Sequence, residues 1–301
     1  MVSSVSTSVI IPVLNGAQTI GDTLSALMNQ SIQPQKFEII VVDNGSADGT
    51  QKIVQNYNVT LLNELKRGPS AARNRGLHYA SGEIIGYLDA DTIPTRRWLS
   101  EIIKPFSNPE VFITSGKLLF YRPETPAQRF AARRGGMAEE AALREVFPFA
   151  PSGNMAVRRA AALAIGGWAE GMRTSEDIDF SYRLLKKYPS KIVYVPGALA
   201  MIRTRRTDQE LKAQAWTWGE GLGHLYRKYP EAIHYDVGHV INLFLVLGFR
   251  STLPLFLRIR YWFGLCTRGD LEFAVYNRIW SWYYWRGFFS MYRSERRREL
   301  P

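Results

Sequence analysis

The sequence predicts an α/β fold: a mostly parallel sheet of Rossmann-like βαβ units, followed by a helical C-terminal extension rich in aromatic residues and arginine. Two observations carry this prediction. Short apolar, β-branched runs alternate with stretches of helical periodicity over the first 110 or so residues, as is typical of parallel strands joined by helices. From about residue 207 the strand pattern stops and aromatic segments of helical character begin. We therefore expect two domains, 1–206 and 207–301.

The bulk composition is that of a folded protein with an anionic partner. Hydrophobic residues make up 46% of the 301 positions, so the chain can bury a full core. The single cysteine, Cys266, excludes an internal disulfide and a cysteine metal cluster, and it suggests a reducing compartment. No basic stretch precedes the first apolar run, so we expect no secretory signal. The net charge of +11 favours nucleotide phosphates, anionic lipid or nucleic acid as partners.

The pattern predicts the elements in this order. In the first part of the chain, we expect strands over 8–14, 37–42, 59–62 and 84–88, and helices over 19–27, from 49, over 71–79 and over 98–106. In the second part, we expect strands over 111–121 and 192–195, a turn plus a short strand over 152–157, and helices over 126–144, 158–165, 174–185 and 211–229.

Polar side chains follow three of the predicted strands at the point where each strand ends. Asn15 ends the first strand, Asp43 the second, and Asp89 and Asp91 the strand at 84–88. Because parallel strands bring their carboxyl ends to one edge, where ligands bind, these residues should meet there. Asp89 and Asp91 would point to the same side, so their charges need a compensating cation, and Mg²⁺ or Mn²⁺ suits them. For an isolated Asp-x-Asp, an ordinary solvated turn is the open alternative.

The C-terminal extension combines aromatic residues with positive charge. From Arg250 to the end there are ten arginines and no lysine, against four acids. The apolar run at 240–247 is too short to span a bilayer, and charged residues and Pro254 interrupt the segment after it. We interpret the aromatic segment 276–292 as lying in a membrane interface, which predicts peripheral membrane contact. The alternative is a helical subdomain that packs on the core.

Seven motifs, in a fixed order, resemble glycosyltransferase family 2, whose members have the GT-A fold. They are SVIIPVLN (8–15), VVDNGSADGT (41–50), GPSAARNRGL (68–77), GYLDADT (86–92), SGNMAVRR (152–159), GGW (166–168) and SEDIDFSYRL (175–184). Each motif is weak alone, and their order and separations make the resemblance specific over about residues 8–206. It implies an inverting enzyme that moves a sugar from a nucleotide sugar, most often UDP-linked, to an acceptor hydroxyl. Because the C-terminal extension predicts membrane contact, we expect that hydroxyl to belong to a lipid-linked, polysaccharide or other glycan acceptor.

The resemblance assigns several residues to the donor. Asp43 matches the acid that accepts a hydrogen bond from the base, and such an acceptor discriminates between bases because the wrong base leaves it unpaired. Pro12 and Asn15 match the first loop around the nucleotide. Arg73 falls in a basic segment near the nucleotide, with Arg75 as its neighbour, and a charge on the helix surface is the alternative for either.

The resemblance also implies a divalent cation, Mn²⁺ or Mg²⁺, that bridges the donor diphosphate and offsets charge on the leaving group. Asp91 matches the direct metal ligand, and Asp89 matches a metal ligand or a residue that contacts ribose or a metal-bound water. Arg206, together with Arg203 and Arg205, follows the last core strand, where some members place groups that bind the diphosphate. A basic surface run is equally compatible with these arginines.

The acidic pair of the family matches Glu176 and Asp177, with Asp177 as the base that takes a proton from the acceptor hydroxyl. Asp179 competes for this role, although helix geometry would turn it roughly 200° away from Asp177. On the acceptor side, with Glu176, the resemblance places Gly153, Asn154 and Trp168. Trp168 would either stack on a sugar or belong to the core.

Two other functions stay open from the sequence. A sugar-phosphate nucleotidyltransferase also combines a βαβ nucleotide fold with metal-binding acids, although the acidic pair at 176–177 and the lack of an early glycine-rich basic loop count against it. A non-catalytic membrane or nucleic-acid adaptor would explain only the C-terminal extension. The acids present at every position that the family motifs predict count against it. We expect no nucleic-acid partner, and a cytoplasmic location, peripheral at the inner face of the cell membrane.

Overall fold

A computed structural model describes residues 6–134, 147–203, 206–232 and 237–296. The chain divides into two compact units. The first comprises Met1–Tyr121, Gly136–Met172 and Glu176–Arg203, and the second comprises Arg122–Gly135, Arg173–Ser175 and Thr204–Pro301. The last of these boundaries falls between Arg203 and Thr204, and two short earlier segments also belong to the second unit.

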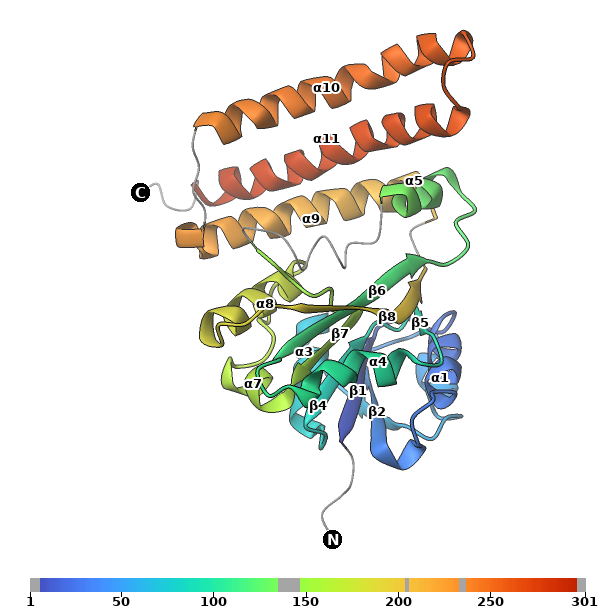
Figure 1. Cartoon of the computed structure of the whole chain (residues 1–301), viewed down its shortest axis with the longest axis vertical. Coiled ribbons are helices and arrows are strands. Elements are labelled where there is room, and N and C mark those ends of the chain that lie inside the picture. Colours follow the sequence, from blue (N-terminus) through green and yellow to red (C-terminus); the bar gives the residue numbers. More distant parts are fainter. Residues whose placement is uncertain (1–5, 135–146, 204–205, 233–236, 297–301) are drawn as a thin grey trace. The chain divides into compact units, whose positions relative to one another are not determined.

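The first unit is built on an eight-stranded mixed sheet with the order β3-β2-β1-β4-β7-β6-β8-β5 (Figure 1). β1 is parallel to β2 and β4, β2 is parallel to β3, and β7 is antiparallel to both β4 and β6. The α/β fold class is therefore confirmed, and the parallel half of the sheet is the half in which strands and helices alternate in sequence. The strands span Thr7–Val13 (β1), Phe37–Asp43 (β2), Thr60–Asn63 (β3), Ile84–Leu88 (β4), Thr92–Pro94 (β5), Ile113–Phe120 (β6), Asn154–Arg158 (β7) and Val193–Ile202 (β8).

Helices cover both faces of this sheet, and each face has its own hydrophobic cluster. Successive residues of β1 alternate between the clusters, because strand side chains point to opposite faces: Val9 and Ile11 enter one and Ile10 the other. The first cluster takes side chains from α1 (Ile20–Met28), α2 (Thr50–Val54) and α4 (Trp98–Ile103). The second takes them from α3 (Pro69–Tyr79), α7 (Arg159–Ala164) and α8 (Glu176–Lys187). Short 3₁₀ helices span Pro34–Lys36 (η1) and Lys104–Ser107 (η2).

The strand register aligns the carboxyl ends of the parallel strands. Val13 lies opposite Asp43, and Asp43 lies opposite Asn63, so β1, β2 and β3 end together. On the other side of β1, β4 ends at Leu88, which pairs with Asn154 at the start of the antiparallel β7. The turn after β4 and the turn before β7 are therefore neighbours at this edge.

The second unit is helical. It contains α5 (Pro126–Arg134), α9 (Asp208–Lys228), η3 (Pro230–Ala232), α10 (Val237–Trp262) and α11 (Arg268–Arg296), and α11 lies between α9 and α10 (Figure 1). Helix α9 begins with a capping box, in which Thr207 Oγ1 accepts from the Glu210 backbone amide at 3.2 Å and the Glu210 carboxylate accepts from the Thr207 amide at 3.0 Å. The part of the expected helix 126–144 beyond residue 134 lies outside the described residues.

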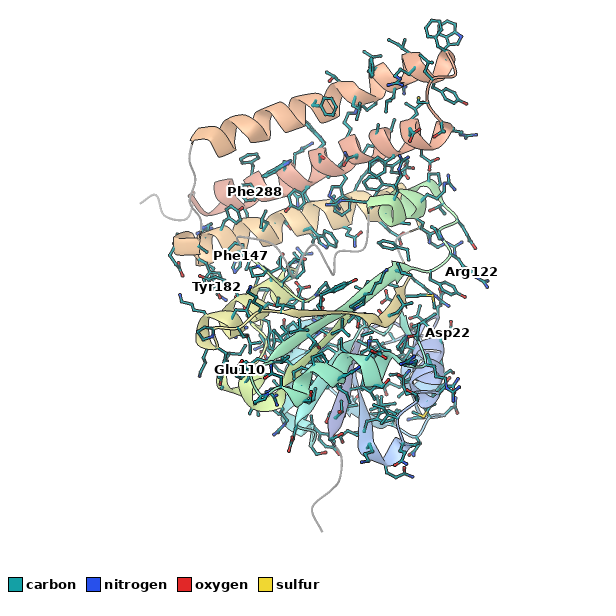
Figure 2. All side chains as sticks on the ribbon, viewed as in Figure 1. Asp22, Glu110, Arg122, Phe147, Tyr182 and Phe288 are labelled. Carbon is teal, nitrogen blue, oxygen red and sulfur yellow. The ribbon has the colours of Figure 1, made fainter. Side chains whose placement is uncertain are left out.

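Glycines let α9 and α11 approach closely. A Cβ at Gly219 would overlap the Tyr284 carbonyl oxygen, so no larger residue fits there without moving a helix backbone. Phe288, labelled in Figure 2, packs edge-to-face against Tyr226 of α9, with ring centroids 5.5 Å apart. This close contact buries Trp280 and Phe288 to about 5% exposure.

The exposed aromatic surface of the second unit lies partly outside the segment 276–292 in which we expected it. Within that segment Trp280 and Phe288 are core residues, whereas Trp282 is 61% exposed. The most exposed aromatic side chains lie at the end of α10 and in the turn after it, where Trp262 is 86% and Phe263 is 72% exposed. Among the described residues, no helix has an apolar stretch long enough to cross a bilayer.

Candidate active site

Arg73 of α3 lies at the centre of the candidate site, and its side chain is 4% exposed. Its Nη2 atom donates to Asp89 Oδ1 at 3.0 Å and to Ser152 Oγ at 2.8 Å, and its Nη1 atom donates to Glu176 Oε1 at 2.9 Å. The guanidinium carbon also lies 4.8 Å from the ring centroid of Trp168. Because the planar guanidinium has donors in fixed directions, one side chain joins the end of β4 to the start of α8.

Small residues bring α3 close enough to the sheet for this contact. A Cβ at Gly76 would lie 2.6 Å from Ile10 Cγ2, so glycine allows α3 to pack tightly on β1. Ala72 is also fully buried against the sheet. Arg75, which follows on the same helix, is exposed, so of the two arginines it is Arg73 that enters the site.

Asp89 and Asp91 occupy the turn after β4, and both are half-exposed. The turn is held by the Thr92 backbone amide, which donates to the Asp89 carbonyl at 3.1 Å, and by the Arg203 amide, which donates to the Asp91 carbonyl at 3.3 Å. A Cβ at Gly153 would lie 2.7 Å from Asp89 Oδ2, so the expected glycine lies directly against this carboxylate.

The carboxylates of this turn are hard oxygen ligands of the kind that Mg²⁺ and Mn²⁺ prefer. They lie at the edge where parallel-sheet ligands bind and are open to solvent on one side, so the donor set fits a divalent cation. Within the described parts of the chain, no group of three or more His, Cys, Asp or Glu residues is placed to hold a metal. A cation at this turn would therefore need oxygen ligands from a substrate and from water.

Asp177 lies in the first turn of α8 and is half-buried. Its carboxylate accepts from the Ile178 amide at 2.9 Å and from the Ser152 amide at 3.4 Å. Burial, and next the charge of Glu176, raise the pKa of Asp177 to about 7, although Arg73 opposes the shift. A carboxyl group whose pKa is raised toward neutrality beside other charged residues suits a general base.

Asp179 has a different environment from Asp177. It is fully buried, and its Oδ2 accepts from Arg183 Nε at 2.8 Å within the same helix. The carboxylate is thus part of an ion pair along α8. This pairing separates the two acids that competed for the role of base in the sequence.

Asp43 ends β2 and is fully buried. Its Oδ2 accepts from the Gly45 amide at 3.3 Å, the Ser46 amide at 3.1 Å and Gln51 Nε2 at 2.7 Å. In the parts of the chain that the structure describes, no group hydrogen-bonds to Oδ1. Leaving a buried acceptor unpaired costs free energy, on the order of 1–3 kcal/mol, so this oxygen is suited to accept from a ligand.

Asn15 joins the loop after β1 to the loop after β2. Its backbone amide donates to Ser46 Oγ at 2.8 Å, and its Oδ1 accepts from the Ala47 amide at 2.9 Å. Asn15 has a φ of 53°, a left-handed conformation that asparagine tolerates better than most residues. Pro12 lies one residue before the end of β1, opposite Val42, and is half-buried.

Two residues expected on the acceptor side are core residues in the structure. Asn154 is fully buried, where its Oδ1 accepts from Trp98 Nε1 at 2.7 Å and its Nδ2 donates to the carbonyls of Lys117 and Ala198. These hydrogen bonds tie β7 to its neighbours, and the side chain does not reach the site surface. Trp168 is 2% exposed and stacks on Phe180 with centroids 4.3 Å apart, so the core alternative applies to it.

Arg206 belongs to the second unit, where its side chain lies 3.3 Å from Glu124. Arg205 lies outside the described residues. Of the three arginines expected near the diphosphate, Arg203 is the one in the first unit, and it donates to the Gln18 carbonyl at 3.1 Å and pairs with Asp22.

Two residues of the site, Ser152 and Gln51, were not predicted from the sequence. Ser152 contacts both Arg73 and Asp177. Its position at the start of the motif SGNMAVRR could have indicated that it belongs to the site. Gln51 donates to Asp43, but nothing in its neighbourhood marks it, because the contact depends on α2 folding back toward β2.

The sequence is similar to that of known proteins. Residues 8–166 match the family model described as glycosyl transferase family 2. Glycosyltransferase AglE of Haloferax volcanii is 32% identical over 185 residues, which is 58% of this chain and 60% of AglE. Poly-beta-1,6-N-acetyl-D-glucosamine synthase of Staphylococcus epidermidis is 27% identical over 70% of this chain and 52% of that protein. The chain therefore spans about half to three fifths of the length of these curated relatives.

Solved structures share the fold at low sequence identity. The mannosyltransferase PcManGT from Pyrobaculum calidifontis, in complex with GDP-Man and Mn2+, has a TM-score of 0.59 at 17% identity and covers 98% of this chain and 76% of its own. S. aureus TarS 1-349, in complex with UDP-GlcNAc, has a TM-score of 0.56 at 16% identity, with 98% of this chain and 93% of its own covered. The family model, which matches more than half of the sequence, decides the assignment: the chain belongs to glycosyltransferase family 2.

Proposed function

We propose that the protein is an inverting, metal-dependent glycosyltransferase. It moves a sugar from a nucleotide sugar to a hydroxyl of a lipid-linked, polysaccharide or other glycan acceptor. The first candidate for the donor is a UDP-sugar. The observation that carries this proposal is the pair of hydrogen bonds from Arg73 to Asp89 and Glu176. They hold the acids at the end of β4 beside the acidic pair of α8, so one site has both a place for the donor and a base.

Asp177 is the proposed general base. Its pKa, raised to about 7, keeps it partly ionised at neutral pH and gives it a strong affinity for a proton. It would take the proton of the acceptor hydroxyl while that oxygen attacks the anomeric carbon and the bond to the nucleoside diphosphate breaks. A single displacement inverts the anomeric configuration and requires no second nucleophile.

Asp91 and Asp89 are the proposed residues for the divalent cation, Mn²⁺ or Mg²⁺. A cation bound there would offset the negative charge that develops on the departing diphosphate. We propose Asp91 as the principal ligand, as its match to the family motif implies, with Asp89, which Arg73 contacts at 3.0 Å, as the second carboxylate. Gly153 leaves room for the Asp89 carboxylate to keep its position.

Asp43 is the proposed residue for the base of the nucleotide. Its Oδ1 is buried and accepts from no group within the described residues, so it can accept from the ring N–H of uracil. Gln51 and two backbone amides fix the carboxylate through Oδ2, which would orient Oδ1 before the donor arrives. Asn15 and Pro12 are proposed to line the nucleotide from the β1 side, and Arg206 to bind the diphosphate.

Exposed apolar residues of α10 support peripheral membrane contact, at the cytoplasmic face of the cell membrane. Leu255, Phe256 and Trp262 are 56–86% exposed, as are Phe263 and Leu265 in the turn that follows. Aromatic side chains with arginines nearby favour the interface of an anionic bilayer. We therefore propose residues 255–265 as the contact surface, rather than the segment 276–292.

Vesicle binding tests this surface. Substituting Trp262 and Phe263 together by serine should reduce co-sedimentation with phosphatidylcholine vesicles that contain phosphatidylglycerol. Leu65→Ser is the matched control, because Leu65 is 93% exposed on the first unit and should have no effect. Unchanged binding of the double variant would remove the proposed contact surface.

Donor binding and turnover test the enzyme proposal. Melting curves with UDP, GDP or dTDP, each with and without Mn²⁺, should show a rise with UDP that requires Mn²⁺ and is lost in Asp91→Ala. A nucleotide present at a hundred times its dissociation constant stabilises the folded protein by about 2.7 kcal/mol, and a melting curve resolves a change of this size easily. A rise with GDP instead would change the donor, and pyrophosphate release from a nucleoside triphosphate would favour a nucleotidyltransferase. No rise with any nucleotide would contradict the proposal.

A further inference from the structure

The second unit contains an open groove that the proposed reaction leaves without a role. It has a volume of about 560 Å³ and is lined mainly by α9, with Tyr283 of α11 and Arg173 completing it. All of these residues belong to the second unit. The volume is sufficient for one or two sugar rings, and the groove holds aromatic, cationic and acidic side chains together.

Two aromatic side chains line the groove, Trp216 of α9 and Tyr283 of α11, and both are half-exposed. A glycine brings the helices together at this point, because a Cβ at Gly287 would overlap the Trp216 carbonyl oxygen. Aromatic rings of this kind offer a rigid apolar face with little rotamer entropy to lose. The C–H face of a pyranose ring can stack on such a surface while its hydroxyl groups stay available for hydrogen bonds.

The charged side chains in the groove are predominantly positive. Arg173 and Lys212 line it, with Glu220 as the acid. In the part of the chain that the structure describes, no carboxylate forms an ion pair with Arg173 or Lys212. The Lys212 ammonium lies 5.9 Å from the Tyr283 ring centroid, which places one cation directly beside an aromatic face. The two cations therefore keep their capacity to bind an anion of a ligand.

The covalent chain links this groove to the proposed base. Arg173 precedes Asp177 by four residues, and four fully extended residues span at most about 14 Å. Arg173 belongs to the second unit and Asp177 to the first, and this short stretch of chain connects them. This makes the acceptor, rather than an unrelated ligand, the occupant with a chemical reason to be there.

We propose that the groove binds an anionic sugar unit of the acceptor, an inference that rests on the proposed function. The pyranose ring stacks on Trp216 and Tyr283, its carboxylate pairs with Lys212 and Arg173, and a ring hydroxyl donates to Glu220. The substrate class is thus an acidic glycan, which also agrees with the chain's net charge of +11.

Two matched probes test the groove with the full-length protein: p-nitrophenyl β-D-glucuronide, which carries a carboxylate, and p-nitrophenyl β-D-glucoside, which carries a hydroxymethyl group in its place. Calorimetry should show about tenfold tighter binding of the glucuronide, as expected for a charge-assisted pair. Lys212→Gln should abolish this preference, and Trp216→Ala should weaken both probes about tenfold. Trp282→Ala is the control, because Trp282 is 61% exposed on α11 but does not line the groove.

Equal binding of the two probes to the wild type would overturn the proposal, as would a preference that Lys212→Gln leaves intact. Lys212 is half-exposed, so this variant reports on the groove even where Trp216→Ala fails to fold. The melting shift with nucleotide, measured in parallel, separates the two proposals. A nucleotide shift without glucuronide preference refutes the groove alone, and glucuronide preference without a nucleotide shift supports the groove and refutes the proposed enzyme.

Discussion

Replacing Glu176 by glutamine tests whether Asp177 is the base and why its pKa is raised. The carboxylate of Glu176 is a neighbouring negative charge that disfavours ionisation of Asp177, second only to burial. Glutamine removes the charge but keeps an oxygen that can accept from Arg73, as Glu176 Oε1 does at 2.9 Å. The variant should therefore retain the geometry of the site and change only its electrostatics.

The size of the effect follows from the pKa of Asp177. A rise from 3.8 to about 7 corresponds to about 4 kcal/mol of free energy against the ionised form. Burial is the largest cause and persists in the variant, so only part of the rise is removed. Losing the like charge of residue 176, while the positive charge of Arg73 stays in place, should lower the pKa of Asp177 by about one pH unit or more.

The assay is the pH dependence of kcat/KM for the acceptor at saturating donor. A general base works when it is deprotonated, so activity should fall as the pH decreases through about 7 in the wild type. In Glu176→Gln the same fall should occur at lower pH. Glu170→Gln is the matched control, because the Glu170 carboxylate is engaged by Lys66 and by Asn74 at 2.9 Å, and its profile should equal that of the wild type. A variant profile that stays in place or moves to higher pH would refute the reasoning.

Three further predictions concern the same site. Asp177→Asn should abolish turnover yet melt at a higher temperature than the wild type at pH 8 and not at pH 4, because a folded-state pKa raised from 3.8 to about 7 means that stability is lost as the pH rises through that range; a lower melting temperature at pH 8 would contradict this. Arg73→Met should lower the free energy of unfolding in urea by about 3–5 kcal/mol, because it leaves two carboxylates unpaired, whereas Arg75→Met on the exposed face should cost under about 0.5 kcal/mol; equal losses would show that Arg73 is an ordinary surface charge. Gly153→Ala should weaken Mn²⁺-dependent nucleotide binding about tenfold in a titration, because its Cβ would lie 2.7 Å from Asp89 Oδ2, and wild-type affinity would show that the Asp89 position is unimportant.

Much of the fold could be predicted because its signals are local. The runs at 8–14, 37–42 and 84–88 are apolar and β-branched, and each forms a strand within a residue or two of the expected bounds. The short β5 was missed, since its three residues carry no periodicity and form a strand by pairing with β8. Pro254 was expected to interrupt the apolar pattern. In the structure it lies inside α10, which continues on both sides of it.

The candidate site was predictable to the extent that it follows from strand ends. Asp43 and Asp89 lie where parallel strands terminate, and the register brings those ends to one edge. Asn154 and Trp168 could not be separated from the other predicted site residues in this way, because a motif does not show whether a side chain faces a ligand or the core. Their burial depends on Trp98, Lys117 and Phe180, which are distant in sequence.

By itself, the sequence determined the fold class, the family and the acids that end β2 and β4, since these depend on periodicity and on residue types at short spacing. Only the tertiary structure showed that Arg73 is buried and Arg75 exposed, and that Asp179 pairs with Arg183 whereas Asp177 contacts Ser152. In each pair both side chains have the same chemistry, and they differ in the face of the helix that packs against the rest of the protein. The sum of burial and neighbouring charge that sets the pKa of Asp177 likewise arises from residues of α3 and α8 that meet only when the chain is folded.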